Sequence, residues 1–105
     1  RIRVSKKKKI EECLFGTGGK SELNFNLNTR KSGSAALDMA YVGAGRYDGY
    51  FQKNLNIWDI AAGVIIIKEA GGKINDIKYS DDKEIKILAG SNSIYDKMLE
   101  KLINF

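Results

Sequence analysis

The sequence predicts an α/β fold: a layered domain in which helices flank a mixed, largely parallel five-stranded sheet. Short segments with strand character alternate with longer apolar segments with helix character, and this order is typical of α/β layers. Neither a repeat nor a linker divides the chain, so residues 1–105 are expected to form one domain. No apolar run approaches the roughly 20 residues that a membrane-spanning helix needs, and no membrane partner is expected.

Five segments are expected to be strands, because they alternate between apolar and polar side chains, include several aromatic residues, or form a short apolar run that leads into a Gly-rich loop. In chain order they are residues 1–5, 13–15, 46–52, 73–77 and 84–89. Residues 20–32 are polar and rich in Asn, so they are expected to form a loop with a short extended or helical piece.

The central helix is expected over Ile60–Ala70, which contains no Pro and is apolar on nearly every side, as a helix buried in a core is. Gly71 and Gly72 follow it, and glycine ends helices because it adopts the left-handed conformation without a Cβ clash. Asp59 directly precedes it. This position suits an N-cap carboxylate, but carboxylate oxygens also suit Mg²⁺, so the spacing alone leaves both roles open.

A second helix is expected to begin near Gly33, with Ser32 or Ser34 as its cap. Its buried face is expected to consist of Leu37, Ala40, Tyr41 and Ala44. Asp38 lies about one turn inside this helix and is expected to face solvent or to serve as a cap. Backbone N–H groups and a hydroxyl at such a helix start attract phosphate or sugar hydroxyls.

A last helix is expected after Gly90, with Ser91 or Ser93 as its cap. Its apolar stripe is expected to consist of Ile94, Met98, Leu102 and Ile103.

The formal net charge of +5 is unevenly distributed, because residues 1–31 carry nine Lys or Arg and three Glu. Lys6–Lys9 favour a solvated loop, since no aromatic residues are interleaved with them and no nucleic-acid motif accompanies them. Binding of RNA or an acidic partner through this segment remains an alternative. Cys13 is the only cysteine, which fits a reducing, cytoplasmic setting. The chain has no His, which excludes imidazole catalysis and His-metal sites within it.

Residues 58–63, Trp-Asp-Ile-Ala-Ala-Gly, followed by Glu-Ala-Gly-Gly at 69–72, resemble the C-terminal signature of the inositol monophosphatase family. This is the Mg²⁺-dependent, lithium-sensitive sugar-phosphatase superfamily. The resemblance covers nearly all 105 residues and implies the C-terminal domain of that fold. The family's acidic metal motif, of the Asp-Pro-Ile-Asp-Gly-Thr type, is not in this chain, which contains no Pro. The resemblance therefore implies the C-terminal, substrate-side half of a longer phosphatase.

The resemblance also implies roles for particular residues. Asp59 corresponds to a metal ligand that also contacts substrate. Gly33, Ser34 and Ala35 correspond to the family's substrate loop, which contacts the sugar. Gln52 stands seven residues before Asp59, where family members commonly carry a Glu that accepts a hydrogen bond from a sugar hydroxyl. Gln keeps an acceptor, adds donors and removes the charge, so the exact substrate is left open.

The function implied is hydrolysis of inositol monophosphate, or of a related small phosphorylated polyol or sugar, by metal-activated water. The family further implies a cytoplasmic homodimer. Fructose bisphosphate, a nucleotide 3′-phosphate and histidinol phosphate remain alternative substrates. The competing class is a non-catalytic module that binds RNA or an acidic partner through Lys6–Lys9. The chain by itself is expected to be inactive, because it carries one assignable metal ligand, Asp59.

Overall fold

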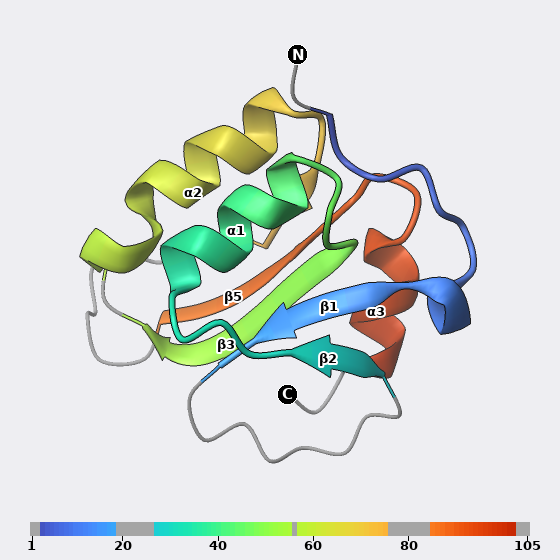
Figure 1. Cartoon of the computed structure of the whole chain (residues 1–105), viewed down its shortest axis with the longest axis horizontal. Coiled ribbons are helices and arrows are strands. Elements are labelled where there is room, and N and C mark those ends of the chain that lie inside the picture. The colour runs from blue at the N-terminus through green and yellow to red at the C-terminus, as the bar shows by residue number, and fades with distance from the viewer. Residues whose placement is uncertain (1–2, 19–26, 56, 76–84, 103–105) are drawn as a thin grey trace.

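A computed structural model describes residues 3–18, 27–55, 57–75 and 85–102 of the chain. Its sheet has the strand order β2-β1-β3-β5-β4 (Figure 1). Strand β1 pairs in parallel with β2 and β3, whereas β5 pairs antiparallel with β3 and β4. The strands are β1 (Leu14–Thr17), β2 (Asn28–Arg30), β3 (Gly49–Leu55), β4 (Lys73–Ile74) and β5 (Ile85–Gly90). The predicted mixed five-stranded sheet is confirmed.

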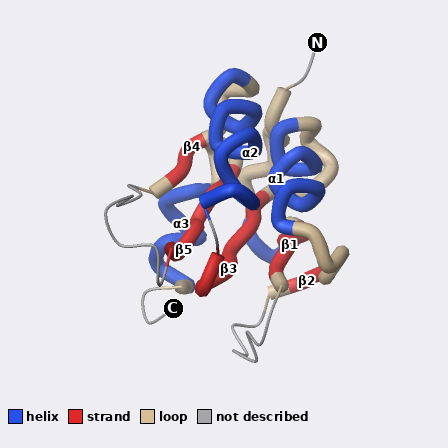
Figure 2. The backbone as a smooth tube through the Cα atoms, turned by 90° about the vertical axis from the view of Figure 1, so that its left-hand side faces the viewer, coloured by secondary structure: helices blue, strands red, loops and turns tan. Residues whose placement is uncertain are grey.

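Helices cover both faces of this sheet. Helices α1 (Ala35–Gly43) and α2 (Ile57–Glu69) pack side by side on one face, and α3 (Tyr95–Lys101) covers the other (Figures 1 and 2). A short 3₁₀ helix, η1 (Ile10–Glu12), precedes β1. The three α-helices confirm the predicted α/β layers.

The alternation of side chains along the strands builds a separate core on each face. In β3, Tyr50 packs with α1 and α2, whereas its neighbour Phe51 packs with α3. In β5, Ile87 faces the first core and Leu88 faces the second. Because both faces are buried, apolar side chains stand at consecutive positions in each strand, as at Tyr50-Phe51 and at Ile87-Leu88.

Several predicted elements differ from the structure at the chain's N-terminal end and at the caps. Residues 3–9 form no strand; the Val4 N–H donates to the Ala70 carbonyl at 3.2 Å, so this segment lies against the end of α2. The N-cap of α3 is Ile94, and neither Ser91 nor Ser93 caps it. The Ser93 hydroxyl instead donates to the Lys7 carbonyl at 2.7 Å. This hydrogen bond holds the N-terminal segment against the start of α3. Ile103 and residues 19–26 and 76–84 lie outside the described residues.

The predicted buried face of α1 is wrong. Its buried residues are Asp38, Met39, Val42 and Gly43. Leu37 is 42% exposed. The helix carries apolar residues on both sides, so its periodic pattern does not specify which side is buried. The close packing of α2 against α1 determines it.

The two helices on this face approach each other closely at Gly63. A Cβ placed there would lie 2.8 Å from the Cβ of Met39 and 2.7 Å from its Sδ, and Met39 is fully buried. We expect Gly63→Val to lower the free energy of unfolding by about 1–3 kcal/mol through overpacking. Urea unfolding measures this. Ala62→Ser, at an exposed position of the same helix, is the matched control and should change stability by less than about 0.5 kcal/mol. Equal effects of the two variants would show that the helices do not meet at Gly63.

Candidate substrate pocket

A pocket of about 290 Å³ opens where α1 begins and where β1 and β3 end. Four residues predicted as substrate contacts line it together, namely Gly33, Ser34, Ala35 and Gln52. The other lining residues are Gly18, Ala36, Asp38 and Leu55. Two segments distant in sequence, the loop before α1 and the strand β3, thus converge on one hollow. The sequence motifs gave no indication of Gly18, Ala36 or Leu55, because their role comes from where the neighbouring strands end.

A compact turn at residues 32–34 leads into α1. Ser34 is the N-cap, and its hydroxyl oxygen accepts from the Leu37 N–H at 3.2 Å, which confirms one of the two predicted caps. Its own N–H donates to the Ser32 hydroxyl oxygen at 3.1 Å. Gly33 has φ +85°, a conformation that a residue with a Cβ rarely adopts. The turn therefore places the positive end of the α1 dipole at the pocket wall, which favours anionic or hydroxyl-rich ligands.

The opposite wall is formed by β3. Gln52 and Tyr50 lie on the same face of the strand, and the Tyr50 hydroxyl donates to the Gln52 Oε1. The amide rests on the backbone of Gly18, where a Cβ would lie 2.6 Å from that Oε1. Within the described part of the chain, the Gln52 amide nitrogen has no hydrogen-bond partner. Gln52 therefore brings two unused N–H donors to the pocket.

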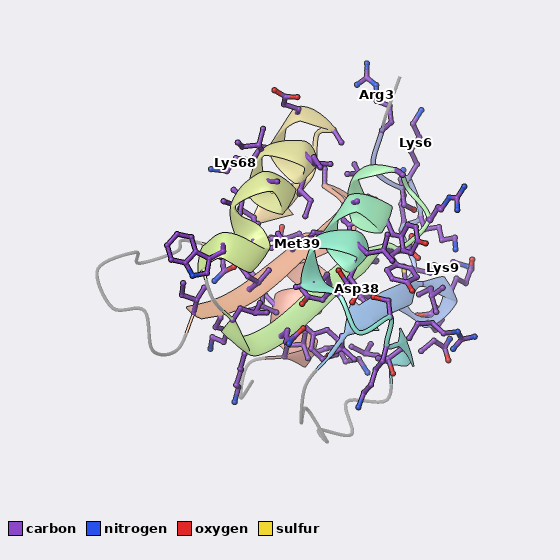
Figure 3. All side chains as sticks on the ribbon, turned by 60° about the vertical axis from the view of Figure 1, so that its left-hand side comes forward. Arg3, Lys6, Lys9, Asp38, Met39 and Lys68 are labelled. Carbon is purple, nitrogen blue, oxygen red and sulfur yellow. The ribbon has the colours of Figure 1, made fainter. Side chains whose placement is uncertain are left out.

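Asp38 is buried, which corrects the expectation that it faces solvent or caps the helix. It is 1% exposed, and among the described residues its Oδ1 has no hydrogen-bond partner. Figure 3 shows Asp38 beside Met39 on α1, in the interior of the molecule, whereas Lys68 lies at the surface of α2. Burial raises the pKa of the Asp38 carboxyl above its ordinary value of 3.8, and a hydrogen bond with Ser32 opposes this rise. Asp38 thus supports the turn before α1 from inside.

A carboxyl whose pKa is raised on folding stabilises the fold most when it is protonated. The contribution of Asp38 is therefore fully present below its ordinary pKa of 3.8 and is lost as the pH rises through the raised, folded-state value. We expect Asp38→Asn to increase the free energy of unfolding at neutral pH and to have a smaller effect below pH 3.8. Urea unfolding from pH 3 to 8 measures this, with the exposed Asp96→Asn as control. A gain that did not depend on pH would contradict the burial argument.

Asp59 lies in the first turn of α2, as its third residue, because the helix begins at Ile57 rather than at Ile60. The expectation that Asp59 directly precedes the helix is therefore wrong, because the helix begins three residues earlier than expected. The strand β3 ends at Leu55, a pocket-lining residue, so the chain enters α2 from the pocket. A carboxylate in a helix's first turn is favourably placed relative to the dipole. The backbone of Asp59 thus lies four residues beyond the pocket wall.

A second buried acid, Asp48, lies at the start of β3, at the other end of the sheet from the pocket. Its Oδ2 accepts from the Leu14 N–H at 2.7 Å and lies 3.6 Å from the Lys7 Nζ. Burial and the neighbouring Asp48 raise the pKa of the Cys13 thiol to about 11, which favours the protonated thiol over the reactive thiolate at neutral pH. Lys7 thus anchors the N-terminal segment, while Arg3, Lys6 and Lys9 lie at the periphery (Figure 3).

Within the described residues, no three Asp, Glu or Cys side chains gather closely enough to hold a metal ion. Across the same residues, no helix has the length and apolar character to span a membrane. The fold and the pocket define an α/β domain with a partly polar pocket at the N-terminus of α1, beside the ends of β1 and β3.

Comparison with known proteins assigns this chain to a family. The profile of the inositol monophosphatase family matches residues 1–104. The inositol-1-monophosphatase of Caulobacter vibrioides is 36% identical, over 97% of this chain and 47% of the relative. The fructose-1,6-bisphosphatase/inositol-1-monophosphatase of Thermotoga maritima is 41% identical, over 99% of this chain and 44% of the relative. The chain belongs to the inositol monophosphatase family, and it spans about half the length of the curated relatives it matches.

Solved structures show the same fold. Inositol monophosphatase from Anabaena (Nostoc) sp. PCC 7120 superposes with a TM-score of 0.84 at 32% identity, over 98% of this chain and 48% of that one. A third kind of relative carries another name: the Nus factor SuhB of Pseudomonas aeruginosa is 34% identical, over 94% of this chain and 44% of the relative. The family therefore includes relatives named as phosphatases and relatives named as Nus factors.

Proposed function

We propose that this chain is the C-terminal, substrate-side half of a Mg²⁺-dependent phosphatase that hydrolyses inositol monophosphate or another small sugar phosphate. The observation that carries this proposal is the convergence of Gly33, Ser34, Ala35 and Gln52 on one pocket in a member of this family. A pocket of about 290 Å³ is close to the smallest volumes typical of ligand sites, which suits a monosaccharide or cyclitol.

The chemistry expected of each side chain follows from its type. Ser34 and the backbone of Gly33 and Ala35 orient the sugar hydroxyls at the start of α1. Asp59 supplies one carboxylate ligand to Mg²⁺, which favours oxygen ligands, and the remaining ligands come from outside this chain. When bound, the metal lowers the pKa of a water molecule and stabilises charge on the phosphoryl oxygens.

An exposed apolar stripe on α2 supports the proposal that another half of the protein covers this domain. Trp58 and Ile65 are 85% and 59% exposed, and they lie two turns apart on the same side of the helix, with Ala61 and Ala62 between them. Such contiguous apolar surface is characteristic of interfaces. The relatives are about twice as long as this chain, so their other half is the occupant we propose.

The test is phosphate release by the complete protein from a panel of inositol, fructose, glycerol and nucleotide phosphates, with and without Mg²⁺. We propose a cytoplasmic homodimer as the form to assay. Release from the sugar phosphates that requires Mg²⁺ and is reduced by Li⁺ supports the proposal. Absence of release from every substrate would refute it.

The second candidate function is a binding role without catalysis, favoured by the relatives named Nus factor SuhB and by the exposed Lys6, Lys8 and Lys9. Charge reversal of these three lysines in the complete protein separates the two functions. If the variant loses RNA binding but releases phosphate normally, the basic segment is assigned to RNA binding. If the protein is a phosphatase only, the unmodified protein does not bind RNA in the first place.

A further inference from the structure

We propose that Asp38 is a positioning residue whose protonation sets the shape of the turn at residues 32–34, and with it the affinity of the pocket for a sugar phosphate. This inference rests on the proposed phosphatase function and adds a regulation of the same site by pH. Asp38 is not expected to contact the substrate. It acts through the side chain of Ser32, which belongs to the turn that leads into α1.

Asp38 lies directly beneath this turn, on the part of α1 that borders the pocket (Figure 3). Its backbone N–H donates to the Ser34 carbonyl at 3.0 Å, and its side chain is 1% exposed. The strand β1 closes the space on the other side, because a Cβ at Gly16 would lie only 3.3 Å from the Cβ of Asp38. The carboxyl therefore has little room to turn toward solvent, and within the described residues its Oδ1 has no hydrogen-bond partner.

One hydroxyl proton in the turn has two possible acceptors. The Ser32 hydroxyl oxygen accepts from the Ser34 N–H at 3.1 Å, and the same hydroxyl donates to the Ser34 carbonyl at 3.1 Å. Ser32 also forms the hydrogen bond that opposes the rise in the Asp38 pKa, which requires its hydroxyl to donate to the ionised carboxylate. A hydroxyl carries a single proton, so it cannot fully serve both acceptors at once.

The protonation of Asp38 decides between these two acceptors. A protonated carboxyl donates to the Ser32 oxygen, and the Ser32 hydroxyl then donates to the Ser34 carbonyl, which closes the turn. An ionised carboxylate only accepts, so it draws the hydroxyl away from the turn and adds a negative charge beside the pocket. Both changes disfavour a phosphorylated ligand. The affinity is therefore expected to fall as the pH rises through the raised pKa of Asp38.

The other titratable groups near Asp38 do not account for such a change. Tyr47 faces it from the segment after α1, and burial, followed by the neighbouring Asp38, raises the pKa of Tyr47 above its ordinary value of 10.0. Arg30 of β2 lies close enough to Tyr47 to oppose that rise. None of the remaining described groups on or against α1 shifts the pKa of Asp38, namely Tyr41, Arg46, Tyr50, Lys53, Lys68, Glu69 and Lys86.

The first measurement is KM for inositol 1-phosphate from pH 4.5 to 8, in the complete protein and in its Asp38→Asn variant. Asn donates to Ser32 at every pH, so it imitates the protonated acid. Dividing the two KM values cancels the titration of the substrate phosphate and of Asp59, which both proteins share. The ratio should approach one at the acidic end and rise roughly two- to tenfold by pH 8, the value of one hydrogen bond, with a smaller change in kcat. Asp96→Asn is the control and should follow the unmodified protein at every pH.

A second measurement, without substrate, distinguishes positioning from a simple loss of charge. The ¹H–¹⁵N signals of the Ser34 and Leu37 amides should move with pH in the complete protein, with a midpoint above 3.8, and should stay constant in Asp38→Asn. Ser32→Ala, at an exposed position, should abolish most of this movement, because the carboxyl loses its link to the turn. The same variant should raise KM roughly two- to tenfold at acidic pH, where Ser32 otherwise closes the turn.

The two measurements separate failure of this inference from failure of the proposed function. If no substrate is hydrolysed but the amide signals titrate as expected, the phosphatase function is wrong and the positioning role of Asp38 stands. If the KM ratio is independent of pH, or if the amides of Ser32→Ala titrate like those of the unmodified protein, the inference is overturned. Mg²⁺-dependent phosphate release would then still support the phosphatase.

Discussion

Asp59→Asn in the complete protein is expected to lower kcat/KM for the preferred sugar phosphate by more than ~100-fold, since loss of groups that merely support metal ligands already costs about 10–100-fold. Asn removes the negative charge that a hard cation favours but keeps an oxygen that accepts hydrogen bonds. Asp59 lies in the first turn of α2, and Asn is tolerated at such a position although it removes the charge that the helix dipole favours. Stability should fall by only about 0.3–1 kcal/mol, the usual contribution of a charge near a helix dipole.

The measurement is kcat across a Mg²⁺ titration, together with the melting temperature. Asp96→Asn is the matched control, because Asp96 is an acid in the first turn of α3. It changes the charge at a helix N-terminus in the same way without touching the pocket, and it should leave kcat unchanged. Normal turnover of Asp59→Asn at every Mg²⁺ concentration would show that Asp59 serves only the helix.

Much of the candidate site could be predicted from the sequence because its parts are local. Ser34 caps α1 by a hydrogen bond to Leu37, three residues away, and Gly33 has the positive φ that its position in the turn requires. Gln52 lies on a strand whose aromatic residues predicted it. Each of these features depends on neighbours within a few residues, which is the range over which sequence patterns are informative.

The features that the sequence did not reveal depend on tertiary packing. Asp38 is buried because α1 turns its Asp38–Met39–Val42 side toward the sheet, and an almost wholly apolar helix does not specify that side. Gly18 lines the pocket because it follows β1, and β1 pairs in parallel with β3, so that the ends of these two strands lie side by side. The hydrogen bond between Tyr50 and Gln52 depends on the orientation of both side chains at the pocket wall, which a sequence pattern does not specify. The resemblance to a family added residue roles that no local pattern supplied.

The 105-residue chain by itself is expected to release no phosphate from any phosphomonoester above the background rate, whereas the complete protein releases it in the presence of Mg²⁺. A two-metal site needs several carboxylates, and Asp59 is the one carboxylate that we propose from the family motif in this chain. His cannot substitute, because the chain contains none. The described residues already form a buried apolar cluster on each face of the sheet, so the isolated chain is expected to fold and its inactivity to reflect missing ligands.

The experiment assays the isolated chain and the complete protein at equal concentration, and circular dichroism establishes whether the isolated chain is folded. Adding the separately purified remainder of the protein should restore Mg²⁺-dependent release, because the apolar side of α2 with Trp58 and Ile65 offers a surface for it. Asp59→Asn in the isolated chain is the control for this complementation and should prevent it. Mg²⁺-dependent release by the isolated chain that survives repurification would show that its own residues build the metal site.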